Sequence, residues 1–368
     1  MNLSLQRRYF RYFDWISFTI TTLLLILGLI FVFSATYSTR QPISFFFKKQ
    51  LIGALSGLII YFLFSSFDLQ RLTRYAFFGY FGALALLLYT VISGYMAMGA
   101  RRWISLYFIR MQPAELVKLC LPAFIAYFFL EPDLWSKASR AAKFAFCLGM
   151  LGICFILIRK QPDLGTAIVI LLDGLLLLWL VGLSRKFFII TGLILTIASP
   201  LIWHSLKPYQ QQRISVLLGQ GNSQKEGYQM QQAKIAIGSG GLWGKGLLKG
   251  TQNKLGFLPE DHNDFIFAVV AEEWGFVRTL LIIALFCVLF VRILYHLLQV
   301  SSPLHRLIGM GLLLHIMLSF TINIGMVAGL LPVVGIPMPL FTYGISNLWI
   351  CLASLGWLNN ITIRRFYY

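Results

Sequence analysis

The sequence predicts an all-α integral membrane protein with about ten transmembrane helices and one large extracytoplasmic loop between the seventh and the eighth. Three observations lead to this fold class. Hydrophobic residues make up 58% of the 368 residues. Charged residues make up only 12%, whereas soluble domains carry about 25%. The apolar residues also fall into blocks close to the roughly 20 residues that a helix needs to cross a bilayer.

Ten such blocks follow one another along the chain. The predicted spans cover residues 15–35, 51–67, 75–98, 114–130, 143–158, 164–183, 187–206, 276–297, 306–330 and 344–362. The second, fourth and fifth are short. A polar stretch at 207–264, rich in Gly and Gln, predicts an ordered loop with short helices. Since no second domain is indicated, we expect residues 1–368 to form a single polytopic membrane domain.

Basic residues predict the orientation. Arg7, Arg8 and Arg11 precede the first span, which is longer than a signal-peptide core and lacks a small-residue cleavage site, so we expect a retained anchor. Under the positive-inside rule, the N- and C-termini are cytoplasmic. The short outer loops are more basic than topology alone requires, which indicates a use for positive charge on that side.

The charge balance limits the function classes. There are 31 Lys and Arg residues against 13 Asp and Glu residues, a net charge of +18. Such an excess fits anionic lipid or a polyanionic substrate. We exclude nucleic acid as a partner because no recognition motif is present. The five cysteines lie in apolar runs without a CxxC pair, so no metal-binding thiol cluster is predicted.

Span four opens with a polar motif. Gln112 and Pro113 precede Glu115, and proline is favoured in the first turn of a helix. Lys118 follows Glu115 by three residues, so the two side chains share one helix face and can pair.

The same kind of opening recurs at three other spans. Span six follows Gln161, Asp163 and Thr166, span eight follows the segment 258–265, and span ten follows 337–347. With a cytoplasmic N-terminus, all four helix starts face outward. Each helix N-terminus carries partial positive charge and unpaired N–H donors. The four starts therefore predict an anion-attracting outer surface, although proline-capped helix starts are also ordinary architecture.

The segment around span eight is too long for one crossing. As a helix, residues 264–297 would run about 50 Å. Glu272 and Glu273 lie in its first third. We therefore expect that third to sit in the outer interface or a polar cavity, and the crossing part to start near Phe276.

A glycine-rich run at 238–246 is interleaved with Lys234, Lys245 and Lys249. It is not a P-loop, because the Gly-Lys-Ser/Thr ending and a preceding strand are missing. Two readings stay open. The backbone could approach phosphate or sugar closely, with lysines as point charges, or the run could be a flexible turn.

These motifs resemble the SEDS family (shape, elongation, division and sporulation), and within it the RodA branch. The likeness covers nearly the whole chain, and the matching segments are 112–118, 161–166, 234–241 and 257–268. The chain departs from the family at Asn263, at Ala271 and in the segment 342–346, and the last departure affects the shape of the span-ten entrance.

The resemblance implies a peptidoglycan glycosyltransferase in the bacterial inner membrane that uses lipid II, with Asp264 as the catalytic carboxylate. It also implies a class B penicillin-binding protein as partner, together with other membrane proteins of the elongation complex. A positioned carboxylate can take the proton of an acceptor hydroxyl, and nearby cations can stabilise the leaving pyrophosphate. A divalent cation bridging the pyrophosphate is compatible with this chemistry, and no cofactor is otherwise expected.

Further side chains are candidates for substrate binding. We predict that Glu115 orients Lys118 and that cations hold phosphate. The full set of candidates is Arg101, Arg102, Glu115, Lys118, Gln161, Asp163, Thr166, Lys234, Ser239, Gly240, Lys245, Glu260 and His262.

Three alternatives stay open from the sequence. A lipid II flippase would need a polar path through the bilayer, for which Asp173, in the middle of span six, is the clear candidate. Asp173 could equally be a buried, protonated or hydrogen-bonded acid. A non-catalytic cell-wall scaffold would tolerate Asp264→Ala. A division-type (FtsW-like) rather than an elongation-type enzyme is the third, although the short N-terminus and the chain length favour elongation.

Overall fold

The structure is a computed structural model. It describes residues 11–39, 42–97, 100–106, 109–131, 138–218, 226–258 and 262–366. The helices are α2 (Trp15–Thr36), α3 (Phe45–Ser66), α4 (Leu69–Ser93), α5 (Pro113–Leu130), α6 (Arg140–Lys160), α7 (Leu164–Val181), α8 (Arg185–Ile197), α9 (Ser199–Ser205), α10 (Pro208–Leu217), α11 (Glu226–Ser239), α12 (Thr251–Lys254), α13 (Ile266–Leu298), α14 (Pro303–Val327) and α15 (Ile345–Ile363).

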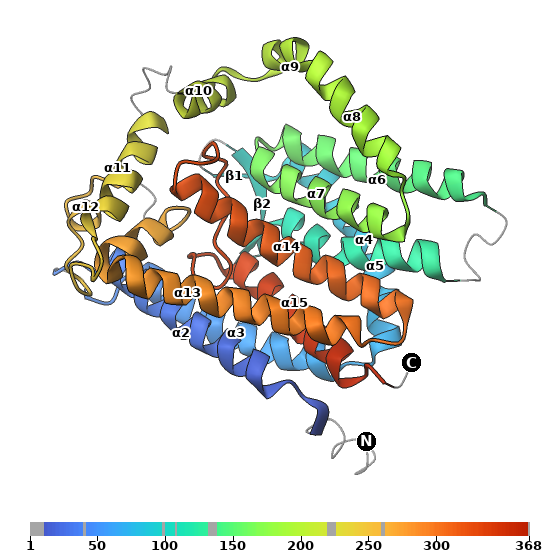
Figure 1. Cartoon of the computed structure of the whole chain (residues 1–368), viewed down its shortest axis with the longest axis horizontal. Coiled ribbons are helices and arrows are strands. Elements are labelled where there is room, and N and C mark those ends of the chain that lie inside the picture. The colour runs from blue at the N-terminus through green and yellow to red at the C-terminus, as the bar shows by residue number, and fades with distance from the viewer. Residues whose placement is uncertain are drawn as a thin grey trace.

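The predicted membrane class is confirmed. Within the described ranges, eight helices are long and apolar enough to cross a bilayer: α2 to α7, α13 and α14. The predicted seventh span is a bent pair, because α8 and α9 meet at 57°. Figure 1 shows α8 and α9 leading away from the bundle and α10 and α11 continuing along its margin. No side chain of α8 is buried.

The predicted tenth span forms a helix, α15, but it is too polar to count among the eight. Its polar side chains bond to neighbouring helices. Asn360, for example, donates to the carbonyl oxygens of Phe64 (2.7 Å) and Phe67 (2.9 Å) at the end of α3. Almost all of α15 is buried. A polar helix is stable here because protein, and not lipid, surrounds it.

A small sheet, which the sequence did not predict, accompanies the helices. The third helix ends at Ser93, before the end predicted for span three, and the chain continues as β1 (Tyr95–Ala97), β2 (Ala100–Leu106) and β3 (Ile109–Met111). The three strands are antiparallel in the order β1-β2-β3. Aromatic and β-branched residues between 95 and 111 favour strands, a preference that the length of an apolar block does not report.

An ion-pair cluster joins the helix ends near the two termini. Asp14 caps α2, and its carboxylate lies 2.7 Å from Arg292 and 3.3 Å from His296, both on α13. The Asp14 backbone N–H donates to Asn359 of α15. Burial by itself raises the pKa of Asp14, but hydrogen bonds from His296, Arg292 and Ser17 outweigh it and hold the pKa below its ordinary value. The first residues of α2 and the last of α15 lie at the same end of the bundle (Figure 1).

Candidate active site

The four helix starts singled out by the sequence meet at the opposite end of the bundle, here called the motif end. Its first connection joins α5 to α7. Gln112 donates to Asp163 Oδ2 at 2.7 Å, and Asp163 Oδ1 accepts the N–H of Thr166 at 3.2 Å. Asp163 is therefore the N-cap of α7 and also the link to α5. A carboxylate suits this place because it satisfies orphan N–H donors at a helix start.

Arg102, on β2, holds the turn that leads into α7. Its Nε donates to Gln161 O at 3.0 Å, a second nitrogen donates to Pro162 O, and its Nη1 lies 3.8 Å from Asp163 Oδ2. The buried Gln161 side chain donates to Thr90 Oγ1 at 2.6 Å, on α4. The sheet that the sequence did not predict thus places Arg102 at the motif end. Arg101, the residue before it, is exposed.

Asp264 lies in the turn just before α13, and its backbone is held by Asn323 of α14. The Asn323 amide donates to Asp264 O at 2.9 Å and to Ile336 O at 2.7 Å. Gly335 has φ +72°, and a Cβ there would lie 3.2 Å from Asp264 Oδ2. The Asp264 side chain is half-buried. One buried amide on α14 therefore joins the Asp264 turn to the loop that precedes α15.

The same loop touches α7 and α15. A Cβ at Gly165 would lie 2.5 Å from Val334 O, so α7 starts directly against this loop. The Tyr343 N–H donates to His262 O at 3.0 Å, which ties the entrance of α15 to the Asp264 turn. Of the predicted residues, Asp163, Thr166, His262 and Asp264 are thus brought together. Glu260 falls outside the described residues.

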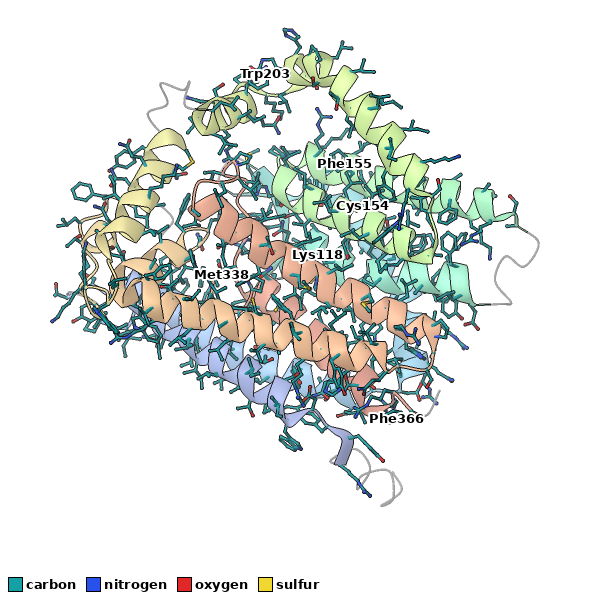
Figure 2. All side chains as sticks on the ribbon, in the orientation of Figure 1. Lys118, Cys154, Phe155, Trp203, Met338 and Phe366 are labelled. Atoms are coloured by element: carbon teal, nitrogen blue, oxygen red, sulfur yellow. The ribbon has the colours of Figure 1, made fainter. Side chains whose placement is uncertain are left out.

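Glu115 and Lys118 form the predicted pair, with 2.7 Å between Lys118 Nζ and Glu115 Oε1. Both side chains are buried, and Figure 2 shows Lys118 within the bundle. Asn347 of α15 donates to Glu115 at 3.2 Å. The pair lines a cavity of about 10 Å³ together with His315. Because that volume holds about one water, the phosphate role predicted for Lys118 would require the cavity to open.

The backbone of the glycine-rich run replaces part of the helical hydrogen bonding of α13, an arrangement here called the splice. The sequence did not reveal this role. That helix breaks at Gly275, which has φ 71°. In an unbroken helix the N–H groups of residues 276 and 277 would donate to the carbonyls of 272 and 273. Here Phe276 N and Val277 N donate to the carbonyls of Gly241 and Leu242, at 2.8 and 3.2 Å.

The carbonyl groups on the N-terminal side of the break also have partners in the glycine-rich run. The freed carbonyls of Glu272 and Glu273 accept from Lys245 N (3.1 Å) and Gly246 N (2.9 Å). All four backbone groups are therefore paired, as buried backbone groups must be. The expectation that a second part of this long segment starts near Phe276 agrees with the break at Gly275.

Two buried carboxylates reinforce the splice. Glu272 Oε1 accepts from Lys245 Nζ at 2.6 Å and from the backbone of Thr251 at 2.8 Å. Glu273 accepts from Ser34 Oγ of α2 at 2.6 Å. Lys245 also donates to Ser239 at 2.8 Å. The glycine-rich run is thus held on α13 by hydrogen bonds, and its close approach to phosphate or sugar stays a prediction.

The two remaining candidates from this region, Gly240 and Lys234, pack against other helices. A Cβ at Gly240 would overlap Ala271 O, so the loop backbone touches α13 there. The Lys234 side chain lies on Gly329, just past the end of α14, where a cation is favourable next to free carbonyls. Gly240 and Lys245 therefore contact α13 at residues 271 and 272, between Asp264 and the break at Gly275. Substrate contacts by Lys234, Ser239, Gly240 and Lys245 stay predictions.

Asp173 is buried in α7, and neither of its carboxyl oxygens has a hydrogen-bond partner within the described part of the chain. It is not among the residues that line the cavity of Lys118. The hydrogen-bonded reading of Asp173 is therefore not supported. Within the described ranges, no group of three or more His, Cys, Asp and Glu side chains could hold a metal ion.

Sequence reasoning missed several residues of this site. Asn323 and His315 lie inside apolar runs, and Gln50 follows two lysines at the start of α3. A lone buried amide or imidazole inside a span was the available signal, because polar groups at membrane depth are costly. Their partners could not be inferred, since each contact joins segments far apart in the sequence.

The chain matches known proteins over nearly its whole length. The family model FTSW_RODA_SPOVE, described as "Cell cycle protein", matches residues 14–366. The chain is similar to the peptidoglycan glycosyltransferase MrdB of Escherichia coli (strain K12), at 37% identity over 350 residues that cover 94% of this chain and 93% of that protein.

Two solved structures share the fold. One chain comes from "Structural coordination of polymerization and crosslinking by a peptidoglycan synthase complex". It has a TM-score of 0.81 and 26% identity, and the match covers 97% of this chain and 99% of that one. The other is the rod shape determining protein RodA of Thermus thermophilus, with a TM-score of 0.72 and 25% identity over 97% and 98% of the two chains.

Proposed function

The chain belongs to the FtsW, RodA and SpoVE family of cell cycle proteins, and on this basis we propose that it polymerises lipid II into glycan strands at the outer face of the bacterial inner membrane. In this proposal it is an elongation-type peptidoglycan glycosyltransferase with Asp264 as general base. The relative named MrdB supports a glycosyltransferase and the elongation type. The positive-inside rule supports cytoplasmic termini and an outward-facing motif end.

The observation that carries the proposal is the setting of Asp264. It is a half-buried carboxylate whose backbone is fixed by Asn323, at the point where the starts of α7, α13 and α15 meet. Catalytic bases are most effective when their position is set before the substrate arrives. Four other carboxylates, those of Glu115, Asp163, Glu272 and Glu273, are buried, whereas that of Asp264 is half-buried.

The reaction follows from this arrangement. The acceptor hydroxyl attacks the anomeric carbon of the donor, its proton passes to the Asp264 carboxylate, and the bond from that carbon to the pyrophosphate oxygen breaks. A new glycosidic bond forms, and the lipid pyrophosphate leaves. Developing negative charge on the leaving group is stabilised by the N-terminal dipoles of α7 and α13 and by Arg102 and Arg101.

A partner is part of the proposal. The structural neighbour belongs to a complex that coordinates polymerisation and crosslinking. By analogy, we expect this chain to work with a class B penicillin-binding protein, which supplies the crosslinking transpeptidase, and with other membrane proteins of an elongation complex.

The test is polymerisation of lipid II by the purified protein with its penicillin-binding partner co-expressed and blocked by a β-lactam. Wild type should form glycan chains, and Asp264→Asn, which keeps shape and removes the base, should form none. Asp68→Asn is the matched control, because Asp68 is exposed and caps α4, away from the site. Equal polymer from Asp264→Asn and wild type would remove Asp264 from the mechanism. No polymer from wild type would overturn the proposed function.

A further inference from the structure

Three rings from distant parts of the chain meet beside the Asp264 turn. Phe46 lies in the first turn of α3, His262 two residues before Asp264, and Tyr343 just before α15. The ring centroids are 4.6 Å apart for Phe46 and His262, 5.2 Å for Phe46 and Tyr343, and 5.8 Å for His262 and Tyr343. Phe46 is 40% exposed, so this cluster, here called the ring platform, reaches the surface.

A buried amide holds the ring platform in place. Gln50 is one turn further along α3 than Phe46 and is 1% exposed. Its Nε2 donates to Thr342 O at 3.1 Å, and its Oε1 accepts from Gly344 N at 3.1 Å. The two peptide groups on either side of Tyr343 are therefore clasped by one side chain from α3. Burial of an amide side chain is costly unless its donor and its acceptor are both hydrogen-bonded, and both groups of Gln50 are.

A positive charge borders the same cluster. Ser346 of α15 donates to Arg110 O at 2.8 Å, which places Arg110 near Tyr343. The Arg110 guanidinium is exposed and lies 4.7 Å from the centre of the Tyr95 ring. Burial raises the pKa of Tyr343 and the charge of Arg110 opposes that shift, so the phenol keeps its proton at neutral pH and can donate it in a hydrogen bond.

We propose that Phe46, His262 and Tyr343 form a sugar-binding subsite, on which the apolar face of a pyranose ring of the glycan substrate lies next to Asp264. A pyranose presents C–H groups on its faces and hydroxyls at its edge. Aromatic rings match the former, and the polar tips of Tyr343 and His262 match the latter. This inference rests on the proposed glycosyltransferase function, and it assigns a ligand contact to Phe46 and Tyr343 and a positioning role to Gln50.

The neighbouring Phe45 provides the contrast. It is 63% exposed, more than Phe46, and its ring lies 4.5 Å from Lys49. The Phe45 ring also lies against that of Phe46, with 6.3 Å between the centroids. Phe46 instead contacts two rings that are fixed to the Asp264 turn, since the Tyr343 N–H donates to His262 O.

The test compares Phe46→Leu, Phe46→Tyr and Phe45→Leu with wild type in two assays. In lipid II polymerisation, Phe46→Leu should raise KM by about three- to tenfold, the range expected for one aromatic contact, with little change in kcat. Phe46→Tyr should retain the wild-type KM, and Phe45→Leu should match wild type. An unchanged KM in a folded Phe46→Leu would overturn the subsite.

The second assay measures binding without turnover. Saturation-transfer NMR with the soluble disaccharide unit of lipid II should show transfer to sugar ring protons in wild type and in Asp264→Asn, and loss of transfer in Phe46→Leu and Gln50→Leu. Transfer that persists in both platform variants would also overturn the subsite. If wild type binds the disaccharide but forms no polymer, the proposed function fails and the subsite stands.

Discussion

The ammonium of Lys245 lies 2.6 Å from Glu272 Oε1, and this contact joins the glycine-rich loop to the helix that begins beside Asp264. Glu272 is fully buried, while Lys245 keeps about a quarter of its side chain exposed. The same carboxylate oxygen accepts the Thr251 N–H. The pair is therefore asymmetric. Lys245 can turn to solvent when it loses its partner, whereas the Glu272 carboxylate also accepts hydrogen bonds from the loop backbone.

That asymmetry predicts unequal losses of stability when either charge of the pair is removed by substitution. Glu272→Ala should lower stability by about 3 kcal/mol, because buried N–H donors lose their acceptor in addition to the ion pair. Lys245→Gln should cost about 1 kcal/mol, because the Gln amide can still donate to the carboxylate, which also keeps its backbone donors. Thermal unfolding of the detergent-purified protein measures both. Lys249→Gln, an exposed lysine of the same loop, should unfold like wild type. Equal losses at Glu272 and Lys245 would contradict the asymmetry.

Two glycines of the loop should differ sharply on substitution. Gly244 has φ +81°, and a Cβ there would overlap Glu273 O, whereas Gly241 has φ +56° and faces open space. Gly241→Ala should therefore cost only the backbone strain, about 1 kcal/mol. Gly244→Ala adds the overlap, so the loop should separate from α13. We expect a much lower unfolding temperature and loss of polymerisation for Gly244→Ala.

Protease sensitivity provides the direct readout of loop separation. Trypsin cleavage at Lys245 or Lys249 should be faster in Gly244→Ala than in Gly241→Ala. Identical cleavage rates in the two variants would show that the splice does not depend on this close approach.

Asn323 should act on catalysis through Asp264. In Asn323→Leu the carbonyls of Asp264 and Ile336 lose their common donor, so the Asp264 turn shifts. Misplacement of a base by about 1 Å can cost roughly a hundredfold in rate. We expect kcat for lipid II polymerisation to fall by about 10- to 100-fold while KM changes little. The control is Asn359→Leu, which removes hydrogen bonds to Tyr61 and Asp14 at the other end of the bundle and should lower stability while kcat is retained.

Asp14 should give the protein a stability component that depends on pH. Its folded pKa lies below the ordinary value of 3.8. A lowered carboxyl pKa contributes stability that is present above the unfolded pKa and is lost as pH falls toward the folded one. The difference in unfolding temperature between wild type and Asp14→Asn should thus be constant down to about pH 5 and shrink below about pH 4. A difference that grows on acidification would have the wrong sign.

Asp68→Asn is the natural comparison for Asp14→Asn. Both carboxylates cap a helix, α4 for Asp68 and α2 for Asp14, but Asp68 is exposed. Its removal should cost no more than an ordinary N-cap, about 1 kcal/mol. Asp14→Asn should cost more, because Arg292 and His296 lose their carboxylate as well.

Local patterns determined much of this protein before any folding was considered. Apolar blocks established the membrane class, since lipid requires long runs without charge. The openings of α5 and α7, with proline or a capping carboxylate, located helix starts because capping is a matter of a few neighbouring residues. The Glu115–Lys118 pair was predictable for the same reason, because a spacing of three places both side chains on one helix face.

Tertiary structure decided what those pieces do together. The polar α15 is stable as a helix because α3, α5 and α14 surround it, and the glycine-rich run gains its role from a break in α13 some 30 residues away. Asn323, Gln50 and the ring platform of Phe46, His262 and Tyr343 act across still longer separations. Sequence periodicity reports the environment of a residue along its own helix, whereas these contacts depend on how the helices pack, and packing sets which distant groups can satisfy one another.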